Sequence, residues 1–239
     1  MTRPLPRIPC RAVLFDAMGT LFHPHPSVGA VYARVARRFG VDADPAALDH
    51  GFRAAWRELA PGRFGADPDR RTSDALEHDW WRGAVGRTFL HAGLEPPSRE
   101  CLEAIFESFA HPDAWRVFPD VAPALAALRE RGLCLGVVSN FDTRLTRICA
   151  GLGLANAFHF ILPSSQAGSA KPAAAIFQRA LRLAATPPHL AVMVGDSPED
   201  DVAGAAAIGC RAILLDRQGR DQHVPAIRSL AELPSVLDA

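Results

Sequence analysis

The sequence predicts an α/β fold, a doubly wound parallel sheet that carries a helical insertion. Three observations lead to this prediction. Short apolar runs alternate with helical patterns along most of the chain. The polar residues that suit catalysis follow the ends of those runs. One long stretch near the N-terminus contains helical patterns and no convincing strand.

Five short, mostly apolar segments are predicted to form the strands. Runs of this length, each closed by a polar residue, proline or glycine, suit a parallel sheet covered by helices on both faces. In chain order the segments are 12–15, 134–138, 158–162, 190–194 and 211–215. The carboxyl ends of parallel strands share one edge of the sheet, where ligands bind in open α/β folds.

Helical patterns separate these strands, as right-handed crossovers between parallel strands require. The first begins at Val121, with Asp120 as the expected N-cap and Gly132 as the expected stop. The other candidates are 143–152, 172–184 and 198–208.

The stretch from about Ser27 to Ala110 is predicted to be an all-helical insertion. Its helical patterns occupy 28–39, 46–59, 73–92 and 98–109. Because the insertion follows the first strand directly, we expect it to cover the carboxyl edge of the sheet. The expected domains are an α/β core of residues 1–24 and 111–239 and a helical cap of residues 25–110.

Composition and charge argue against several classes of partner. Of 239 residues, 49% are hydrophobic and 22% charged, which permits a full core. The 26 basic and 26 acidic residues balance, so electrostatics suggest no nucleic-acid or membrane-surface partner. No apolar run could span a bilayer, and none resembles a signal peptide. Five cysteines without a CxxC pair suit reduced thiols, so we expect a cytoplasmic protein.

An aspartate closes the first strand, in the segment Phe15-Asp16-Ala17-Met18-Gly19-Thr20-Leu21. A carboxylate at a strand end beside a glycine-containing turn can act as a covalent nucleophile or bind a cation. Aspartate is also common as a capping residue in turns, so this motif alone leaves both interpretations open.

Two weaker signals follow later strands. Ser139 and Asn140 offer a hydroxyl and a backbone N–H that can bind phosphate oxygens, although Ser-Asn is also an ordinary turn pair. Lys171 is the only lysine and precedes Pro172, where a helix is expected to begin. The helix dipole disfavours a lysine there unless an anion compensates it. A solvated surface lysine is the simpler interpretation.

An acidic cluster follows the fourth strand, in Gly195-Asp196-Ser197-Pro198-Glu199-Asp200-Asp201. Like charges this close repel one another, so a divalent cation is the expected compensator. Mg²⁺ is typically held by one or two carboxylates, waters and a substrate phosphate. Helix capping by acidic residues explains one or two of these side chains, but explains poorly the Gly-Asp pair that ends the strand.

The order of these motifs resembles the haloacid dehalogenase superfamily over about Arg11 to Leu215. The insertion matches the helical cap of the first subclass. Within it, 78–81 (His-Asp-Trp-Trp) and 89–94 (Phe-Leu-His-Ala-Gly-Leu) look like the branch related to the rhythmically expressed gene 2 product. The resemblance implies a Rossmann-like core, a helical-bundle cap and a magnesium-dependent phosphatase. Its substrate would be a small phosphorylated metabolite, hydrolysed through an aspartyl-phosphate.

The resemblance also implies a metal site. Asp16 would be both the nucleophile and a ligand of Mg²⁺. Met18 would offer its backbone carbonyl to the metal, while Asp196 and Asp201 would complete the shell. Asp200 is the rival of Asp201 for this role.

The remaining implied roles concern the substrate. Ser139 and the amide of Asn140 would hold the transferring phosphoryl group. Lys171 would neutralise charge between the nucleophile and the phosphate. Thr20, in the first motif, is counted among the substrate-binding residues.

Position 18 departs from the superfamily's phosphatase pattern. Phosphatases normally carry a second aspartate there, which protonates the leaving group and then activates water. A methionine at this position cannot move a proton. General acid–base assistance is worth about 10²- to 10⁴-fold, so we expect slow hydrolysis of unactivated alkyl phosphates.

Two other hypotheses stay open. The 2-haloacid dehalogenases have a similar first motif, but they use no metal and lack the acidic cluster, which favours the phosphatase here. A non-catalytic protein that binds phosphorylated ligands or a partner through Trp80 and Trp81 is the third hypothesis. Packing within the cap or against the core is the simpler explanation of these two rings.

Overall fold

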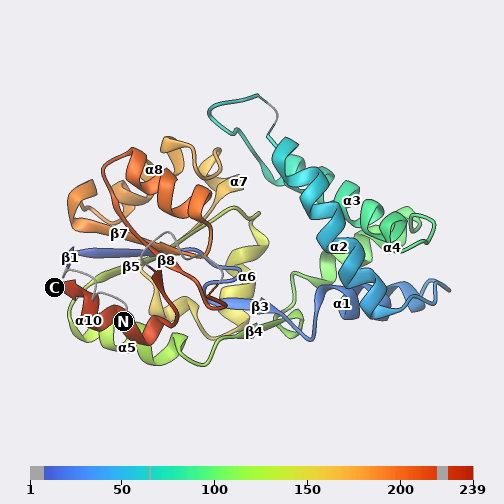
Figure 1. Ribbon diagram of the computed structural model, residues 1–239, viewed down its shortest axis with the longest axis horizontal. Helices are drawn as coiled ribbons and strands as arrows, with labels where there is room; N and C mark the ends of the chain where they lie inside the picture. The colour runs from blue at the N-terminus through green and yellow to red at the C-terminus, as the bar shows by residue number, and fades with distance from the viewer. Residues whose placement is uncertain (1–7, 65, 220–225, 239) are drawn as a thin grey trace.

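The protein consists of a sheet-containing core and a helical unit that lie side by side (Figure 1). The structure, a computed structural model, describes residues 8–64, 66–219 and 226–238. The chain leaves the core after its first sheet strand, forms the helical unit and then returns to complete the core.

A six-stranded parallel sheet with the order β6-β5-β2-β7-β8-β9 forms the centre of the core. The strands are β2 (Ala12–Phe15), β5 (Cys134–Ser139), β6 (Phe160–Pro163), β7 (Ala191–Gly195), β8 (Arg211–Leu215) and β9 (Ala226–Ile227). Phe15 pairs with Val137 on one side and with Val194 on the other, so the carboxyl ends of three strands lie together. The predicted doubly wound parallel sheet is confirmed.

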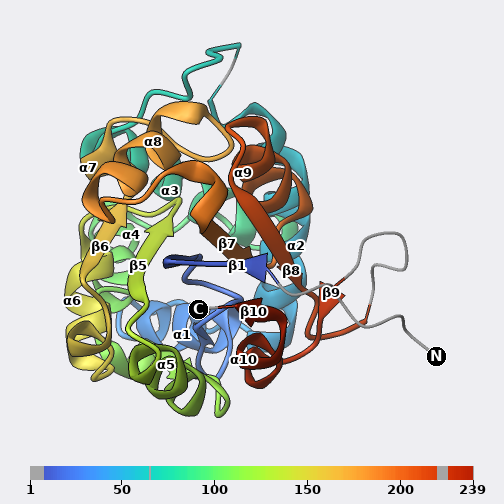
Figure 2. The ribbon, with the colours of Figure 1, turned by 90° about the vertical axis from the view of Figure 1, so that its left-hand side faces the viewer.

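Helices cover both faces of this sheet (Figure 2). Val13 and Phe15 face one layer of helices, whereas Ala12 and Leu14 face the other. The first layer holds α5 (Val121–Glu130), α6 (Arg144–Gly151) and α10 (Leu233–Val236), and the second holds α8 (Ala174–Leu183) and α9 (Gly204–Ala207). Successive side chains of a strand point to opposite faces, so β2 is buried throughout and has an uninterrupted apolar sequence.

Short elements that were not predicted complete the core. β3 (Phe22–Pro24) and β4 (Trp115–Val117) pair in antiparallel fashion where the chain leaves the core and re-enters it. β1 (Ile8–Pro9), which pairs with β10 (Leu237–Asp238), and α7 (Ser164–Ala167) were not predicted either, nor were β9 and α10. The β3-β4 pair holds the two connections to the helical unit together.

The ends of α5 show one correct prediction and one error. Gly132 follows the helix with φ of +73°, a conformation that glycine adopts without strain, and the predicted stop is confirmed. Asp120 precedes the helix, but its side chain makes no capping hydrogen bond. Its carboxylate instead accepts hydrogen bonds from Arg217, Ser229 and the Leu230 amide. These donors lie about 100 residues further along the chain, so local capping rules could not reveal them.

Two other predicted helices differ in their limits. α8 begins at Ala174, so Pro172 precedes the helix and does not lie in its first turn. The predicted helix over 198–208 is divided into a π-helix (Pro198–Ala203) and α9. The acidic residues Glu199, Asp200 and Asp201 lie within the π-helix.

The helical unit consists of α1 (Val28–Arg37), α2 (Pro45–Leu59), α3 (Asp74–His91) and α4 (Arg99–Ser108). Side chains from the four helices share a separate apolar core that includes Tyr32, Leu48, Phe89 and Ile105. Serine or aspartate side chains cap the four N-termini. The described residues between 27 and 110 contain no strand, only an isolated bridge.

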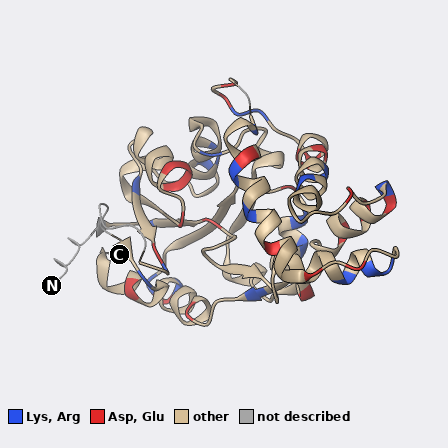
Figure 3. Cartoon of the chain, turned by 45° about the vertical axis from the view of Figure 1, so that its right-hand side comes forward, with Lys and Arg blue, Asp and Glu red and all other residues tan. Residues whose placement is uncertain are grey.

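Acidic and basic residues are interspersed over the part of the chain drawn in Figure 3. Among the described residues, no helix has the length and apolar character that crossing a membrane would need.

Candidate active site

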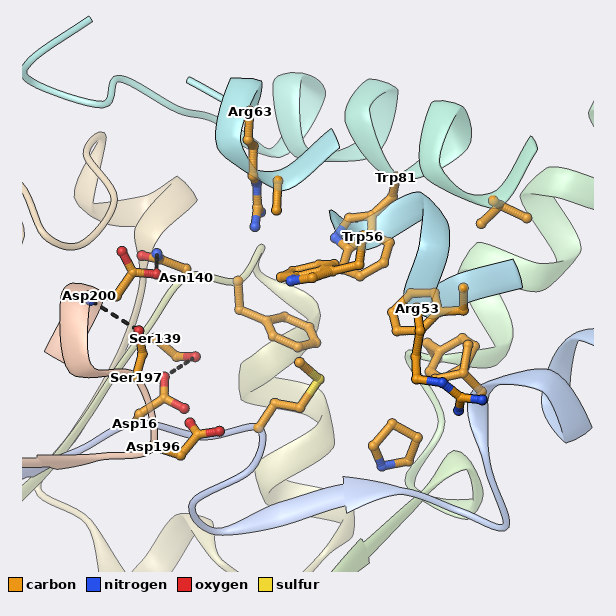
Figure 4. Close-up of a pocket in the computed structure, with 18 of the residues that line it drawn as sticks. Asp16, Arg53, Trp56, Arg63, Trp81, Ser139, Asn140, Asp196, Ser197 and Asp200 are labelled. Carbon is orange, nitrogen blue, oxygen red and sulfur yellow. Dashed lines mark hydrogen bonds between the residues drawn. The ribbon is translucent and has the colours of Figure 1, made fainter. Parts of the chain in front are cut away.

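Residues from four distant parts of the chain meet at the carboxyl edge of the sheet. Asp16 follows β2, Ser139 ends β5 and Asp196 follows β7. Figure 4 shows these three residues together with Asn140 at one end of a cleft. Lys171, from the loop between α7 and α8, lines the same cleft. The structure therefore brings together the main residues that the four motifs nominated.

Lys171 is buried between two carboxylates. Its ammonium donates to Oδ1 of Asp16 over 2.6 Å and to Oδ1 of Asp201 over 2.5 Å, and the residue is 2% exposed. Burial alone would lower the pKa of Lys171, but the two carboxylates outweigh it and raise this pKa above its ordinary value. The interpretation of Lys171 as a solvated surface lysine is wrong.

Asp16 is held from one side. The Ser139 hydroxyl donates to Oδ1 of Asp16 over 3.0 Å, and the Lys171 ammonium donates to the same oxygen. Among the described residues no donor reaches Oδ2 of Asp16. The carboxylate is therefore oriented by two donors while one oxygen is left for another partner.

The Asn140 side chain holds the backbone of Lys171, a role that sequence analysis missed. The Lys171 amide donates to Oδ1 of Asn140 over 2.7 Å, and Nδ2 of Asn140 donates to the Lys171 carbonyl over 3.0 Å. This pair joins the loop after β5 to the loop before α8. It places the lysine beside Asp16, and nothing in the local sequence indicates it.

Three carboxylates form the acidic end of the cleft. Asp16, Asp196 and Asp201 each offer an oxygen, and these atoms lie within 4.8 Å of one another. Asp200 points elsewhere, toward Asn140 and Arg70. Of the two adjacent aspartates, Asp201 is therefore the one that faces Asp16 and Lys171.

The electrostatics of this cluster fit a divalent cation. Burial raises the pKa of Asp196 above its ordinary value, and the charges of Asp16 and Asp201 raise it further. Burial likewise raises the pKa of Asp201, against the opposing effect of Lys171. Three carboxylates around one ammonium leave an excess of negative charge. An oxygen-only donor set of this kind suits Mg²⁺.

Two glycines allow the carboxylates to approach the backbone. A Cβ atom at Gly19, where φ is +91°, would lie 2.3 Å from Oδ2 of Asp196. A Cβ atom at Gly195 would lie 2.0 Å from Oδ2 of Asp201. Both glycines of the sequence motifs are thus explained by the space that the aspartates need.

Met18 and Thr20, the other two residues of the first motif with predicted roles, have different surroundings. Met18 lines the cleft, and its carbonyl accepts no hydrogen bond from the described residues. Thr20 is fully buried, its hydroxyl has no partner among the described residues, and it is not among those that line the cleft. The chain turns at Gly19 and Thr20 faces the interior, so its role in substrate binding stays a prediction.

The cleft extends from the acidic end to the helical unit and has a volume of about 1190 Å³. Phe52, Trp56 and Trp81 line it from the side of the helical unit, with Arg53 and Arg57. Sequence analysis did not single out the α2 residues. Their i, i+4 spacing was the available signal, since it places Phe52 with Trp56 and Arg53 with Arg57 on neighbouring strips of one helix.

Trp80 and Trp81 have different surroundings. Trp80 packs within the helical unit, edge-on against Trp56 with ring centroids 5.5 Å apart, and the Arg63 guanidinium lies over it at 4.4 Å. Trp81 lines the cleft and stacks parallel to Phe52. Packing within the helical unit therefore accounts for Trp80, while Trp81 also faces the cleft.

Residues 66–73, which we call the strap, lie between α2 and α3 in the chain and reach from the helical unit to the core (Figure 1). The Ser169 hydroxyl donates to the Asp69 carbonyl over 2.6 Å, and the Ala170 amide donates to the Arg70 carbonyl over 3.0 Å. The Arg70 guanidinium donates to Glu199 over 3.1 Å. The strap thus contacts both the lysine loop and the acidic turn.

Comparison with known proteins agrees with this geometry. The sequence profile of a hydrolase family, described as haloacid dehalogenase-like hydrolase, matches residues 10–209. Human haloacid dehalogenase-like hydrolase domain-containing protein 3 is 37% identical over 97% of this chain and 95% of its own length. A phosphoserine phosphatase from Thermus thermophilus is 32% identical over 90% and 92%. The Drosophila melanogaster rhythmically expressed gene 2 protein is 27% identical over 86% and 82%.

Solved structures share the fold. A haloacid dehalogenase-type phosphatase from Thermococcus onnurineus superimposes with a TM-score of 0.65 at 26% identity, over 95% of this chain and 97% of that one. The L-2-haloacid dehalogenase RSc1362 superimposes with a TM-score of 0.76 at 24% identity, over the same shares of the two chains.

Proposed function

Because the chain belongs to the haloacid dehalogenase-like hydrolase family, we propose that it is a Mg²⁺-dependent phosphatase acting on a small phosphorylated metabolite. The observation that carries the proposal is the cluster of three carboxylate oxygens within 4.8 Å, joined to Lys171 and Ser139 through Asp16. The similarity to a phosphoserine phosphatase supports the phosphoryl group as the target.

Asp16 is the proposed nucleophile. Its carboxylate oxygen attacks phosphorus, the bond from phosphorus to the leaving oxygen breaks, and an aspartyl-phosphate forms. Lys171, Ser139 and the amide of Asn140 hold the phosphoryl oxygens. Water then attacks phosphorus, the bond to Asp16 breaks, and inorganic phosphate leaves with the carboxylate regenerated.

Asp16, Asp196, Asp201 and the carbonyl of Met18 would hold the metal. A bound Mg²⁺ supplies charge stabilisation to the phosphoryl oxygens. The Lys171 ammonium adds a second positive charge at the same place, since it lies 2.6 Å from Asp16.

Met18 determines which leaving groups react well. Its thioether lines the cleft where a proton donor would otherwise stand, so the leaving oxygen departs with its charge or takes a proton from water. We therefore expect slow turnover of alkyl phosphates and faster turnover of esters or anhydrides whose leaving group is a weak base.

Residues 25–110 are the proposed cap. The helical unit within this range provides one wall of the cleft and the strap that contacts the core. Enclosure of the phosphate by such a wall excludes water that would otherwise screen the charges.

The decisive experiment measures phosphate release from an aryl phosphate with Mg²⁺ and with chelator, for the wild type and Asp16→Asn. We expect release to need Mg²⁺ and to fall by about 10⁴-fold in Asp16→Asn, because the nucleophile is lost. Asp42→Asn, at a carboxylate that is 91% exposed, is the matched control and should behave as the wild type.

Two results would contradict the proposal. Chloride release from a 2-haloacid without metal would indicate a dehalogenase. Binding of the aryl phosphate by both the wild type and Asp16→Asn, with no product from either, would indicate a protein that only binds phosphorylated ligands.

A further inference from the structure

We propose that the cleft selects a leaving group that is an aromatic ring bearing a negative charge on its far side. The substrate class is then an aryl phosphate whose ring carries a carboxylate. This inference rests on the proposed phosphatase function, which identifies only the phosphoryl end of the substrate. The far end is defined by residues of α1, α2 and α3.

The wall opposite Asp16 is aromatic. Phe52 and Trp81 stack at an interplanar angle of 4°, and the Trp56 ring centroid lies 6.0 Å from each of them. Figure 4 shows Trp56 and Trp81 across the cleft from Asp16. All three rings are half-buried, so each presents apolar surface that a planar ligand could cover.

Tyr32 provides an independent observation. It is 2% exposed, lines the cleft, and its hydroxyl forms no hydrogen bond with any described residue. This hydroxyl is not among the fully buried polar atoms that lack a partner in the described residues, so it reaches the cleft, where it can bond to a polar atom of a ligand.

Two cations in the cleft have no carboxylate partner in the part of the chain that the structure describes. Arg53 and Arg57 lie one turn apart on α2, both are exposed, and no ion pair joins either to a described acidic residue. Like charges four residues apart on a helix repel each other, so an anion between them would be stabilising.

The other arginines of the cleft lack this freedom. Each of them is already paired with a carboxylate: Arg63 with Glu77, Arg70 with Glu199, and Arg144 with Asp142. Among the described residues, Arg53 and Arg57 are therefore the cations of the cleft that remain for a second negative group on the substrate.

The chemistry at Met18 leads to the same substrate class. A phenol has a pKa of about 10, so a phenolate can leave without being protonated far more readily than an alkoxide. A phenolate, which can leave without a proton donor, is thus also the kind of group that the aromatic wall would bind. A cleft of about 1190 Å³ has room for both the phosphoryl group and the aromatic leaving group.

The experiment compares kcat/KM for three substrates with Mg²⁺: acetyl phosphate, phenyl phosphate and 4-carboxyphenyl phosphate. Acetyl phosphate has a good leaving group and no ring. We expect the wild type to prefer 4-carboxyphenyl phosphate over phenyl phosphate by about 10-fold, as one charged contact supplies.

The variants test each part of the cleft. In Arg53→Gln/Arg57→Gln the ratio of 4-carboxyphenyl to phenyl phosphate should fall to about one. In Trp56→Leu the ratio of phenyl to acetyl phosphate should fall by about 5- to 10-fold, and Trp56→Phe, which keeps a ring, should restore most of it. Arg34→Gln, an exposed arginine of α1 outside the cleft, is the control and should keep both wild-type ratios.

The outcomes separate the two proposals. If the wild type hydrolyses acetyl phosphate but both ratios are the same in every folded variant, the aromatic and anionic preference is wrong and the phosphatase stands. If the wild type hydrolyses none of the three substrates, the phosphatase proposal fails and the preference fails with it.

Discussion

At the scale of single residues, Lys171 shows how much a site depends on its surroundings. An ammonium buried without a partner would lose its charge. Here two carboxylates within 2.6 Å keep it protonated, and the Asn140 side chain fixes its backbone. Lys171, Asp16 and the acidic cluster are therefore joined in one unit, and a change in any of them should affect the others.

Met18 leads to a prediction at this scale. Met18→Asp should raise kcat for an alkyl phosphate by about 10-fold or more, because a carboxyl group there can protonate the leaving oxygen and then activate water. An aryl phosphate should gain less, since its leaving group departs unaided. Steady-state phosphate release with Mg²⁺ measures kcat for the alkyl and the aryl phosphate.

Met18→Asn is the matched control for Met18→Asp, because the asparagine amide has nearly the same shape as the aspartate carboxyl group and cannot transfer a proton. Equal activities of Met18→Asp and Met18→Asn, in folded proteins that bind Mg²⁺, would show that position 18 is not the missing acid–base position.

At the scale of elements, five predicted strands were found within two residues of their predicted ends, because fully buried parallel strands need continuous apolar runs. β3 and β4 were not predicted. Each has only three residues, and they pair across the whole helical unit. Periodicity cannot identify a strand so short whose partner lies about 90 residues away.

The Asp120 cluster before α5 leads to a prediction on stability. Its carboxylate accepts from Arg217 over 2.9 Å, from Ser229 over 2.7 Å and from the Leu230 amide over 2.8 Å. Asp120→Asn should lower the free energy of unfolding by about 2 kcal/mol, because charge-assisted hydrogen bonds are lost in a site that is 14% exposed. Urea unfolding at pH 7 measures this difference.

The difference should depend on pH. Burial opposes ionisation of Asp120, but Arg217, Ser229 and the Leu230 amide outweigh it, so the pKa of Asp120 is lowered in the folded state. Because the pKa of Asp120 is lower in the folded state, its ionised carboxylate stabilises the fold above the pKa of the unfolded state, which is about 3.9. This stabilisation is lost as pH falls through the pKa of the folded state. The difference in stability between wild type and Asp120→Asn should therefore shrink as pH falls from the unfolded pKa through the lowered pKa of the folded state. Asp42→Asn, at an exposed ion pair, should change stability by less than about 0.5 kcal/mol.

At the scale of the whole molecule, the strap is one of the places where the helical unit meets the core, in addition to the hydrogen bond from Thr143 to Asp74. It contacts Ser169 and Ala170 beside the buried lysine, and Arg70 reaches the acidic turn. Separation of the strap from the core would therefore break contacts next to Lys171 and contacts with the acidic turn.

Ser169→Ala should loosen this contact. The Asp69 carbonyl loses its 2.6 Å hydrogen bond, worth about 1 kcal/mol, so amide exchange in 168–171 and in the strap should be about 5-fold faster. Hydrogen exchange detected by mass spectrometry measures it.

Ser108→Ala is the control, because it removes a 2.8 Å hydroxyl–carbonyl bond that lies within α4. If both variants show wild-type exchange in the strap, the strap does not hold the two units together.

The sequence by itself determined the sheet, most helices and the four motifs, because these depend on patterns among neighbouring residues. It also predicted that Asp16, Ser139 and Asp196 would meet, since parallel strands bring their ends to one edge, whereas the place of Lys171 beside them followed from the family resemblance alone. The roles of these residues in catalysis stay a proposal.

Only the tertiary structure decided the contacts between distant segments. Lys171 pairs with Asp16 across 155 residues, Asp201 faces this pair while Asp200 turns away, and Thr20 faces the interior. Trp56 faces the cleft because α2 packs over it in one particular orientation. The physical reason is that the direction of a side chain depends on packing between elements, which local periodicity does not specify.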